Sequence, residues 1–295
     1  MYLGGFMEYI FIVNPISGNG HGAVASQVIK EYCNRLKVNF KIIYTKAKGE
    51  AKNIASFYKN KDTVVYSVGG DGTLNEVVNG LYNSKSTLGI VPVGTGNDFY
   101  KTLVDHAGNT IDIGKVNDRY FINIASIGLD AEVASLANTL KEKKYPKELV
   151  YILSLIKNYF SYKNKTIKIN DREENITILT VCNGKYYGNG FKIAPSAKLN
   201  NGMFDVCEVC DIKKLEMIPL ISKLIKGTHT KDNKVNIYNT DKLVIESPIN
   251  LACNVDGEII KNNKFEFSII PNAIEIDYKD NLKINKILKE KKLIK

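Results

Sequence analysis

Short apolar runs alternate with amphipathic stretches through the first hundred residues. The apolar runs lie at residues 8–15, 38–45, 62–68 and 86–93, and stretches with helical periodicity lie at 22–37, 49–60 and 72–83. In the first of these helical stretches, Val24, Val28, Tyr32 and Leu36 fall on one face. Alternation of short apolar strands with helices predicts a three-layer α/β domain, in which helices cover a parallel sheet.

From about Thr110 the pattern changes to many short strand-like runs separated by Gly, Asn and Asp. These runs lie at residues 110–116, 119–128, 164–171, 174–184, 203–209, 241–247 and 264–271, with helical patterns at about 129–141, 146–162 and 213–226. Many short strands with turn signals predict an antiparallel sandwich or barrel. We therefore expect an α/β domain over residues 1–108 and a β-sandwich domain over residues 109–277.

The bulk composition fits a folded chain of two domains, since 295 residues exceed the usual size of one. No apolar run approaches the roughly 20 residues of a spanning helix. The first residues carry no basic stretch before their apolar ones, so we expect no secretory signal and a cytoplasmic protein. Residues 1–6 are expected to form a loose extension ahead of the first strand.

Five cysteines are scattered along the chain, and an odd, dispersed set is not typical of a disulfide framework. Cys207 and Cys210 form a single C-x-x-C pattern. A zinc site would need a second pair or nearby histidines, and none of the three histidines is close in sequence. We interpret both cysteines as strand residues.

The net charge of +10 favours polyanionic partners such as nucleotides, anionic lipid head groups or nucleic acid. Residues 279–295 contribute half of that charge, with seven lysines and two acidic residues. Four apolar residues there could line one side of a short helix, namely Leu282, Ile287, Leu288 and Leu293. Two interpretations stay open: a packed helix with a solvated lysine face, or a basic helix attracted to membranes.

Three glycine-rich turns punctuate the first domain, each where a predicted strand ends. They are "NPISGNGHG" (Asn14–Gly22), "GGDGT" (Gly69–Thr73) and "PVGTGND" (Pro92–Asp98). Ligands of open parallel sheets bind at the carboxyl edge of the strands. Amides freed of side chains could face phosphate oxygens there, and helix N-termini would add positive potential. Three such turns on one edge predict a nucleotide-phosphate site, although any one alone could be a tight loop.

Neither common nucleotide fingerprint is present. No Gly-Lys-Ser/Thr follows these turns, as a P-loop requires, and "GNGHGA" fits the dinucleotide pattern only loosely. The second predicted strand ends at Tyr44 and Thr45, without an acidic residue to hold a ribose.

Asp71 and Asp98 both lie inside these phosphate-binding candidates. A carboxylate beside a phosphate is repulsive unless a divalent cation lies between them, and Mg²⁺ commonly binds one or two carboxylates plus substrate phosphates. The pair therefore predicts a magnesium site, whereas capping of the following helix is the alternative for each aspartate.

A further acidic element lies at Asp256 and Glu258, on either side of Gly257. The sequence "VDGEI" could be an ordinary D-G hairpin turn. The functional interpretation is a carboxylate general base, because transfer of a phosphoryl group to a hydroxyl needs a positioned proton acceptor.

With "NPISGNG", "VGGDGTLNEVVNG", "PVGTGNDF" and "NVDGE" in this order, the chain resembles the diacylglycerol kinase catalytic family, most of all its soluble bacterial lipid kinases. Those kinases are similar to sphingosine and ceramide kinases. The resemblance implies an ATP- and Mg²⁺-dependent kinase that phosphorylates a lipid hydroxyl, with diacylglycerol the default acceptor and phosphatidic acid the product. It also implies that residues 278–295 return to the first domain.

The resemblance assigns roles to individual residues. ATP would contact Asn14, Pro15, Ile16, Ser17, Gly18, Thr45, Gly70, Asp71, Gly72, Thr73, Leu74, Asn75, Glu76, Thr95 and Asp98. Asp71 and Asp98 would organise the catalytic magnesium, directly or through water, which makes Asp71 part of the catalytic set. Glu258 would accept the proton with Asp256 beside it, and which of the two is the base stays open.

One departure from the family pattern concerns a second, structural magnesium in the second domain. Bacterial members often hold it in a "DDG"-like turn, where this chain has "KLNNGM" with Asn201 in place of an aspartate. Lys198 and Met203 could still offer backbone carbonyls, but loss of a carboxylate weakens a site for a hard cation.

Other functions compete with this interpretation. "GGDGT" also occurs in NAD kinases and phosphofructokinases, so a kinase with a soluble substrate is the nearest alternative, and a non-catalytic nucleotide- or lipid-binding regulator is another. We see no recognised nucleic-acid motif and expect no nucleic-acid partner. If the acceptor is a lipid, we expect the protein to dock transiently on the anionic inner face of the membrane. The sequence leaves the oligomeric state open, and a homodimer is among the partners considered.

Overall fold

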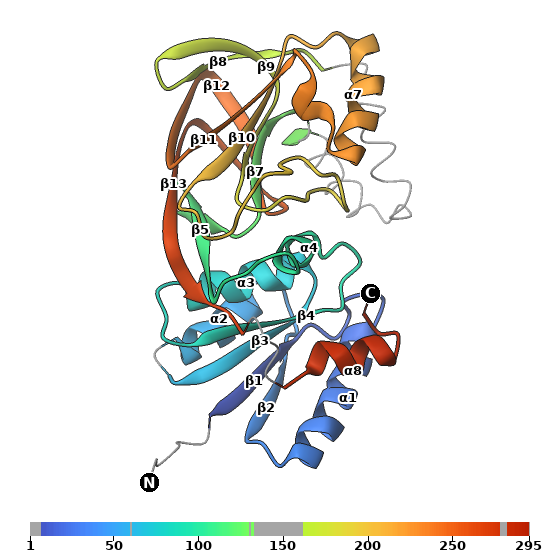
Figure 1. Cartoon of the computed structure of the whole chain (residues 1–295). Helices are drawn as coiled ribbons and strands as arrows, with labels where there is room; N and C mark the ends of the chain where they lie inside the picture. The colour runs from blue at the N-terminus through green and yellow to red at the C-terminus, as the bar shows by residue number, and fades with distance from the viewer. Residues whose placement is uncertain (1–6, 60, 130, 133–161, 278–281, 295) are drawn as a thin grey trace. The chain divides into compact units, whose positions relative to one another are not determined.

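The computed structural model describes residues 7–59, 61–129, 131–132, 162–277 and 282–294 (Figure 1). The extension expected at residues 1–6 and nearly all of the helical patterns expected at 129–141 and 146–162 lie outside this range. The chain divides into two compact units, each with its own sheet. The first unit comprises residues 1–113, 199–201 and 271–295, and the second comprises residues 114–198 and 202–270.

The first unit contains a four-stranded sheet in which all neighbours are parallel, in the order β2-β1-β3-β4. Its strands are β1 (Glu8–Val13), β2 (Phe40–Tyr44), β3 (Thr63–Gly69) and β4 (Thr87–Pro92). Its helices are α1 (His21–Leu36), α2 (Glu50–Tyr58), α3 (Asp71–Leu81), α4 (Asp98–Leu103) and α8 (Ile284–Glu290). The α/β prediction for this part of the chain is confirmed.

Helix α1 buries a different row of side chains from the apolar face noted in the sequence. Ala25, Ile29 and Cys33 are fully buried against the sheet, whereas Val24 and Leu36 are exposed. Two parallel rows of residues compete on this helix, and the row of smaller side chains lets the helix pack closer to the strands. Val28 and Tyr32, from the apolar row, pack only at the margin of the core.

The C-terminal segment completes the core of the first unit. Leu282, Ile284, Leu288 and Ile294 are buried together with Phe11 and other residues of β1, β3 and α1. The lysines of α8 are exposed. The apolar side of this basic helix is therefore occupied by its own protein, as in the packed-helix interpretation.

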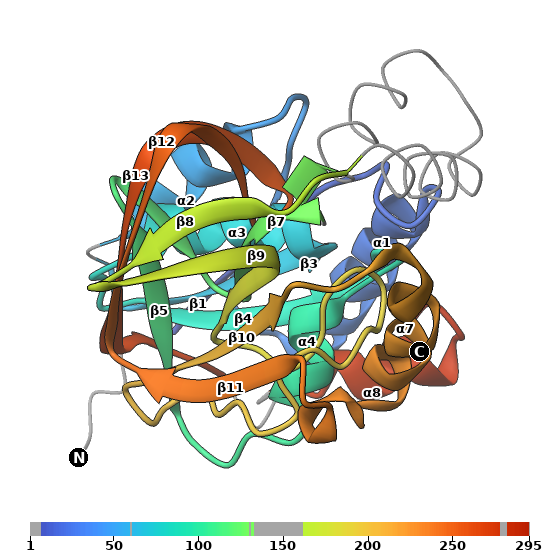
Figure 2. The ribbon, with the colours of Figure 1, turned by 90° about the horizontal axis from the view of Figure 1, so that it is seen from above.

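The second unit is built from antiparallel strands joined in the order β11-β10-β9-β7-β12-β13-β5-β6, with β8 pairing with β9 and β12 (Figure 2). The strands are β5 (Thr110–Val116), β6 (Arg119–Phe121), β7 (Ile124–Gly128), β8 (Lys165–Ile169), β9 (Arg172–Cys182), β10 (Phe204–Cys210), β11 (Val235–Thr240), β12 (Lys242–Val255) and β13 (Glu258–Glu275). Helix α7 (Lys214–Lys226) and a short 3-10 helix (His229–Lys231) follow β10. The predicted β-rich domain is confirmed, with β12 and β13 much longer than expected.

The core of this unit lies between its strands, and Phe121, Phe204 and Phe265 are wholly buried in it. Cys207 and Cys210 both lie in β10 and form no disulfide, in agreement with the strand interpretation. Burial raises the pKa of the Cys210 thiol to about 11. Across the described parts of the chain, no helix has the length and hydropathy of a membrane span.

Candidate active site

The structure brings the three glycine turns together at one edge of the first sheet. Strands β1, β3 and β4 are neighbours and parallel, so their carboxyl ends meet. The Gly94 amide donates to the Gly69 carbonyl at 3.2 Å, which joins the second and third turns. Asn14 Nδ2 donates to Thr73 Oγ1 at 3.2 Å, which joins the first and second.

Close packing between the turns accounts for two of the glycines. A Cβ at Gly18, where φ is +60°, would lie 1.9 Å from the Val93 carbonyl oxygen, and one at Gly94 would lie 2.4 Å from Gly70 Cα. Gly72 is different, because a Cβ there would meet nothing within 4 Å. Its exposed backbone at the start of α3 therefore leaves room for a ligand.

Asp71 ties the second turn to the third. Its Oδ2 accepts the Asp98 amide at 3.1 Å and its Oδ1 accepts the Phe99 amide at 3.2 Å, so this carboxylate caps the N-terminus of α4. Asp98 is only 6% exposed, and Lys101 Nζ lies 2.8 Å from its Oδ1. Asp71 therefore caps α4, whereas the capping alternative expected it to cap α3, the helix that follows it.

The two carboxylates are close enough to repel each other. Burial raises the pKa of Asp71, and the charge of Asp98 raises it further, while the amide bonds and Lys101 act in the opposite direction. A divalent cation at this position would relieve the repulsion, so Asp71 and Asp98 fit the expected magnesium. No cluster of three or more ligating His, Cys, Asp or Glu side chains occurs among the described residues, but Mg²⁺ often takes only one or two carboxylates and completes its shell with phosphates and water.

Other predicted nucleotide contacts divide into buried and exposed residues. Leu74 is 4% exposed, and Glu76 accepts the amides of Gly49 at 2.8 Å and Ala51 at 3.2 Å, so both side chains serve the fold. Ile16, by contrast, is 81% exposed in the first turn. The Thr45 amide donates to the Val13 carbonyl at 2.9 Å, which places Thr45 beside the end of β1. Pro15, Ser17, Asn75 and Thr95 are half-buried or exposed.

In the second unit, the side chain of Asp256 is bound by backbone amides. Its carboxylate accepts hydrogen bonds from Ile122 at 2.7 Å, Asn123 at 3.2 Å and Ile124 at 2.9 Å. Asp256 itself lies in the left-handed region with φ of +47°, in the tight turn between β12 and β13. These three contacts fix the turn against the segment between β6 and β7, which suits a positioning residue better than a base.

Glu258 begins β13 two residues later and is more accessible, with 36% of its side chain exposed. Its Oε2 lies 2.7 Å from Arg119 Nη1, in β6. Sequence reasoning missed Arg119, because it stands 139 residues away and no motif includes it. The same β6–β7 segment thus binds both acidic residues of the turn.

The turn proposed for a structural magnesium carries Lys198, Asn201 and Met203 at exposed positions. The nearest buried carboxylate in sequence is Asp205, which accepts Ser196 Oγ at 2.5 Å and is 2% exposed. Burial raises the pKa of Asp205. This acid follows the turn and was not among the predicted ligands.

Comparison with known proteins agrees with this arrangement of motifs. The family model of the diacylglycerol kinase catalytic domain matches residues 8–124, and that of the YegS C-terminal NAD kinase beta sandwich-like domain matches residues 123–277. The diacylglycerol kinase of Bacillus subtilis (strain 168) is 30% identical over 217 residues, which are 66% of this chain and 71% of the relative. The chain belongs to the diacylglycerol kinase family. It is accordingly an enzyme of the diacylglycerol and lipid kinase type.

Further members of the family show similar agreement. The diacylglycerol kinase of Staphylococcus aureus (strain JH9) is 32% identical over 226 residues, covering 69% of this chain and 70% of the relative. A crystal structure of a protein from Bacillus anthracis str. Sterne superposes with a TM-score of 0.74 at 25% identity, over 94% of this chain and 99% of that one. The predicted two-part fold is the fold of this family.

Proposed function

We propose that this lipid kinase transfers the γ-phosphoryl group of ATP to the hydroxyl of diacylglycerol and so forms phosphatidic acid. The observation that carries the proposal is the convergence of three glycine turns on one sheet edge, with the Asp71–Asp98 pair among them. This arrangement suits a nucleotide triphosphate, because open backbone at Gly72 and the N-terminus of α3 favour phosphate oxygens.

Two sets of residues would carry the chemistry. Asp71 and Asp98 would hold Mg²⁺ beside the phosphates, and that ion would supply electrostatic stabilisation of the transferring group. Glu258 would accept the proton of the lipid hydroxyl, since 36% of its side chain is exposed whereas the Asp256 carboxylate is bound by three backbone amides. Asp256 would keep the turn that carries Glu258 in place through its three amide contacts.

The proposal is tested with radiolabelled ATP and MgCl₂ against a panel of acceptors in mixed micelles. Diacylglycerol should give labelled phosphatidic acid, whereas NAD should stay unlabelled. Phosphatidylglycerol and a sphingoid base belong in the panel, because their hydroxyls offer the same chemistry. Labelled NADP without a labelled lipid would overturn the proposal in favour of a soluble substrate.

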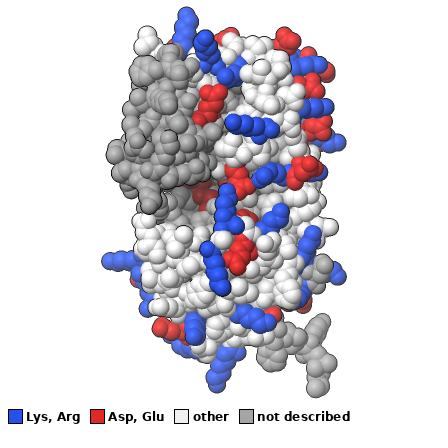
Figure 3. Space-filling model, turned by 180° about the vertical axis from the view of Figure 1, so that it is seen from behind, with Lys and Arg blue, Asp and Glu red and all other residues white. Residues whose placement is uncertain are grey.

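Membrane docking is part of the proposal, because the acceptor lies in a bilayer. The face in Figure 3 carries Lys and Arg side chains scattered among Asp and Glu, without one dominant basic patch. We therefore expect a diffuse attraction of roughly 1 kcal/mol for each basic residue that reaches an anionic surface. Binding to phosphatidylserine vesicles should weaken as NaCl is raised, and binding that is independent of salt would contradict electrostatic docking.

A further inference from the structure

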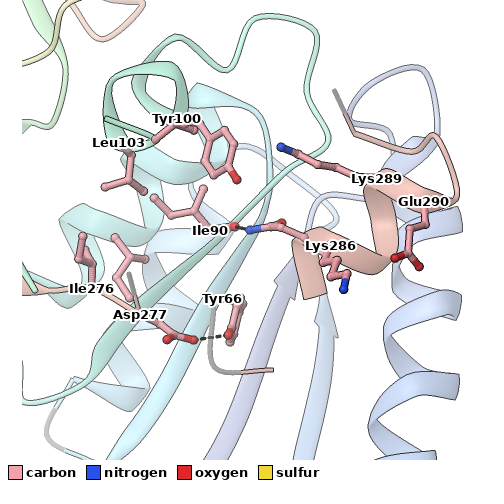
Figure 4. A pocket seen from close by; sticks show the side chains of 12 residues that line it. Tyr66, Ile90, Tyr100, Leu103, Ile276, Asp277, Lys286, Lys289 and Glu290 are labelled. Atoms are coloured by element: carbon pink, nitrogen blue, oxygen red, sulfur yellow. Dashed lines mark hydrogen bonds between the residues drawn. The ribbon is translucent and has the colours of Figure 1, made fainter. Parts of the chain in front are cut away.

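We infer that a cavity in the first unit binds an alkyl chain that ends in an anionic head group. The cavity has a volume of about 720 Å³ and lies beside β4, between α4 and α8 (Figure 4). Small-molecule pockets usually measure roughly 300–1,000 Å³. This inference does not depend on the proposed phosphotransfer, because none of the proposed magnesium or base residues lines the cavity.

Residues just after the end of β13 and from α8 contact the β4 edge beside the cavity. The Asp277 amide donates to the Leu88 carbonyl at 2.8 Å, and Asn285 Nδ2 donates to the Ile90 carbonyl at 2.8 Å. Among the described residues, these two contacts satisfy two of the β4 carbonyls at this edge.

The inner wall of the cavity is apolar. Leu88, Ile90 and Ile276 form it at 8% exposure or less, and Leu103 at the end of α4 and Val104 just after it extend it outward. Val104 is 62% exposed, so the apolar surface continues from the buried wall to the solvent. A continuous surface of this kind suits an unbranched alkyl chain, because each methylene that it covers leaves water.

The opposite wall, formed by α8, carries two lysines and one acidic residue, Glu290, so its net charge is positive. Lys286 and Lys289 are exposed on α8 and line the cavity, and their side chains extend in different directions from the helix (Figure 4). Figure 4 shows the Lys289 side chain extending toward Tyr100. Among the described residues, neither lysine has a carboxylate partner within ion-pair distance. Asp277, the acid at the inner end, already accepts a hydrogen bond from the Tyr66 hydroxyl.

The apolar wall and the lysines together indicate a ligand with an alkyl chain and an anionic head group. A carboxylate or a phosphate monoester on a single chain would place its head group near Lys289 and its methylenes along Ile90 and Leu103. A free fatty acid and a phosphorylated single-chain lipid share this chemistry. Probes of one chain length separate the two sources and isolate the contribution of the head group.

The test is titration calorimetry of the full-length protein with laurate, dodecyl phosphate and dodecanol, each below its micelle or solubility limit. Both anions should bind with one-to-one stoichiometry and dodecanol should bind more weakly. Tighter binding of dodecyl phosphate would assign a phosphorylated lipid, and tighter binding of laurate a fatty acid. Binding of dodecanol as tight as that of both anions would overturn the role of the lysines, and absence of binding by any probe would overturn the site.

Three variants locate the site. Leu103→Trp should fill the cavity and weaken all probes, by about fourfold for each methylene displaced. Lys289→Gln should weaken the two anions about two- to fivefold and leave dodecanol unchanged. Lys291→Gln is the matched control, because this exposed lysine of the same segment does not line the cavity and should bind as wild type.

Circular dichroism and melting temperature must show that Leu103→Trp is folded. If it is not, Val104→Trp at the exposed mouth is the substitute. A folded Trp variant with wild-type affinity for laurate and dodecyl phosphate would place their binding elsewhere. If Lys289→Gln and Lys291→Gln weakened the binding of laurate and dodecyl phosphate equally, the net charge of the protein would explain the loss, and the specific site would be overturned.

Discussion

Replacing Asp256 by Asn tests whether this residue holds the turn between β12 and β13 in place or acts directly on the substrate. The carboxylate of Asp256 accepts three backbone amides, at 2.7, 2.9 and 3.2 Å. Asn has nearly the same shape and tolerates the left-handed backbone at this position. Its side-chain amide nitrogen, however, is a donor, so it must face at least one backbone N–H without accepting it.

The expected cost follows from these contacts. A hydrogen bond to a charged group contributes about 1.5–3 kcal/mol, and a neutral one about 0.5–1.5 kcal/mol. Losing one charged bond and weakening the others should therefore cost the local structure about 2–4 kcal/mol in opening free energy. At 1.4 kcal/mol per factor of ten, exchange of the amides at residues 122–124 should accelerate roughly 30- to 700-fold.

Hydrogen exchange with mass spectrometry measures this directly on peptides that span Ile122–Ile124. Asp118→Asn is the matched control, since it removes the same charge from an exposed residue of the β5–β6 turn. Its exchange at residues 122–124 should equal that of wild type. If Asp256→Asn lost all kinase activity while these amides kept wild-type protection, Asp256 would act on the substrate and the positioning argument would be wrong.

Three further changes test other parts of the site. Glu258→Gln should slow the chemical step about 10²- to 10⁴-fold in single-turnover kinetics while the melting temperature stays unchanged; normal turnover would remove Glu258 from the mechanism. Gly20→Ala should lower the free energy of unfolding in urea by the ~1–2 kcal/mol that a left-handed backbone costs a residue with a Cβ. Gly18→Ala should lower it by well over that amount, because the new Cβ at residue 18 would also collide with Val93. Equal losses in the two variants would contradict the close packing. MgCl₂ should raise the melting temperature of wild type at pH 7 but not that of Asp71→Asn. The pKa of Asp71 is raised, and a protonated carboxyl does not bind Mg²⁺. On acidification, the rise in melting temperature caused by MgCl₂ should therefore disappear at a higher pH than it would if Asp71 had the pKa of an ordinary aspartate. An equal rise in the melting temperature of Asp71→Asn would exclude Asp71 as a ligand.

The local periodicity of apolar residues was sufficient to predict most of the strands and helices that form the two units. The predicted strand at residues 110–116 coincides with β5, and the helix expected at 213–226 differs from α7 by one residue. These elements have a clear period of two or 3.6 and turn residues at both ends, so the chain itself carries the information.

Elements and roles that depend on contacts between distant residues could not be predicted from the sequence. Helix α4 has only six residues, too few for a period, and its N-terminus is capped by Asp71 from another turn. Strand β11 is rich in Asn and became a strand by pairing with β10. The amide partners of Asp256 lie more than 130 residues earlier, so no motif could distinguish its role from that of Glu258.

The C-terminal segment also sets the order in which the chain can fold during synthesis. Phe11 of β1 shares a core with Leu282, Ile284 and Leu288, so the N-terminal unit lacks part of its interior until residues 282–294 leave the ribosome. All residues of the second unit are made before that point. The part of the chain made first must therefore finish folding last, in contrast to the usual succession of domains from the N-terminus.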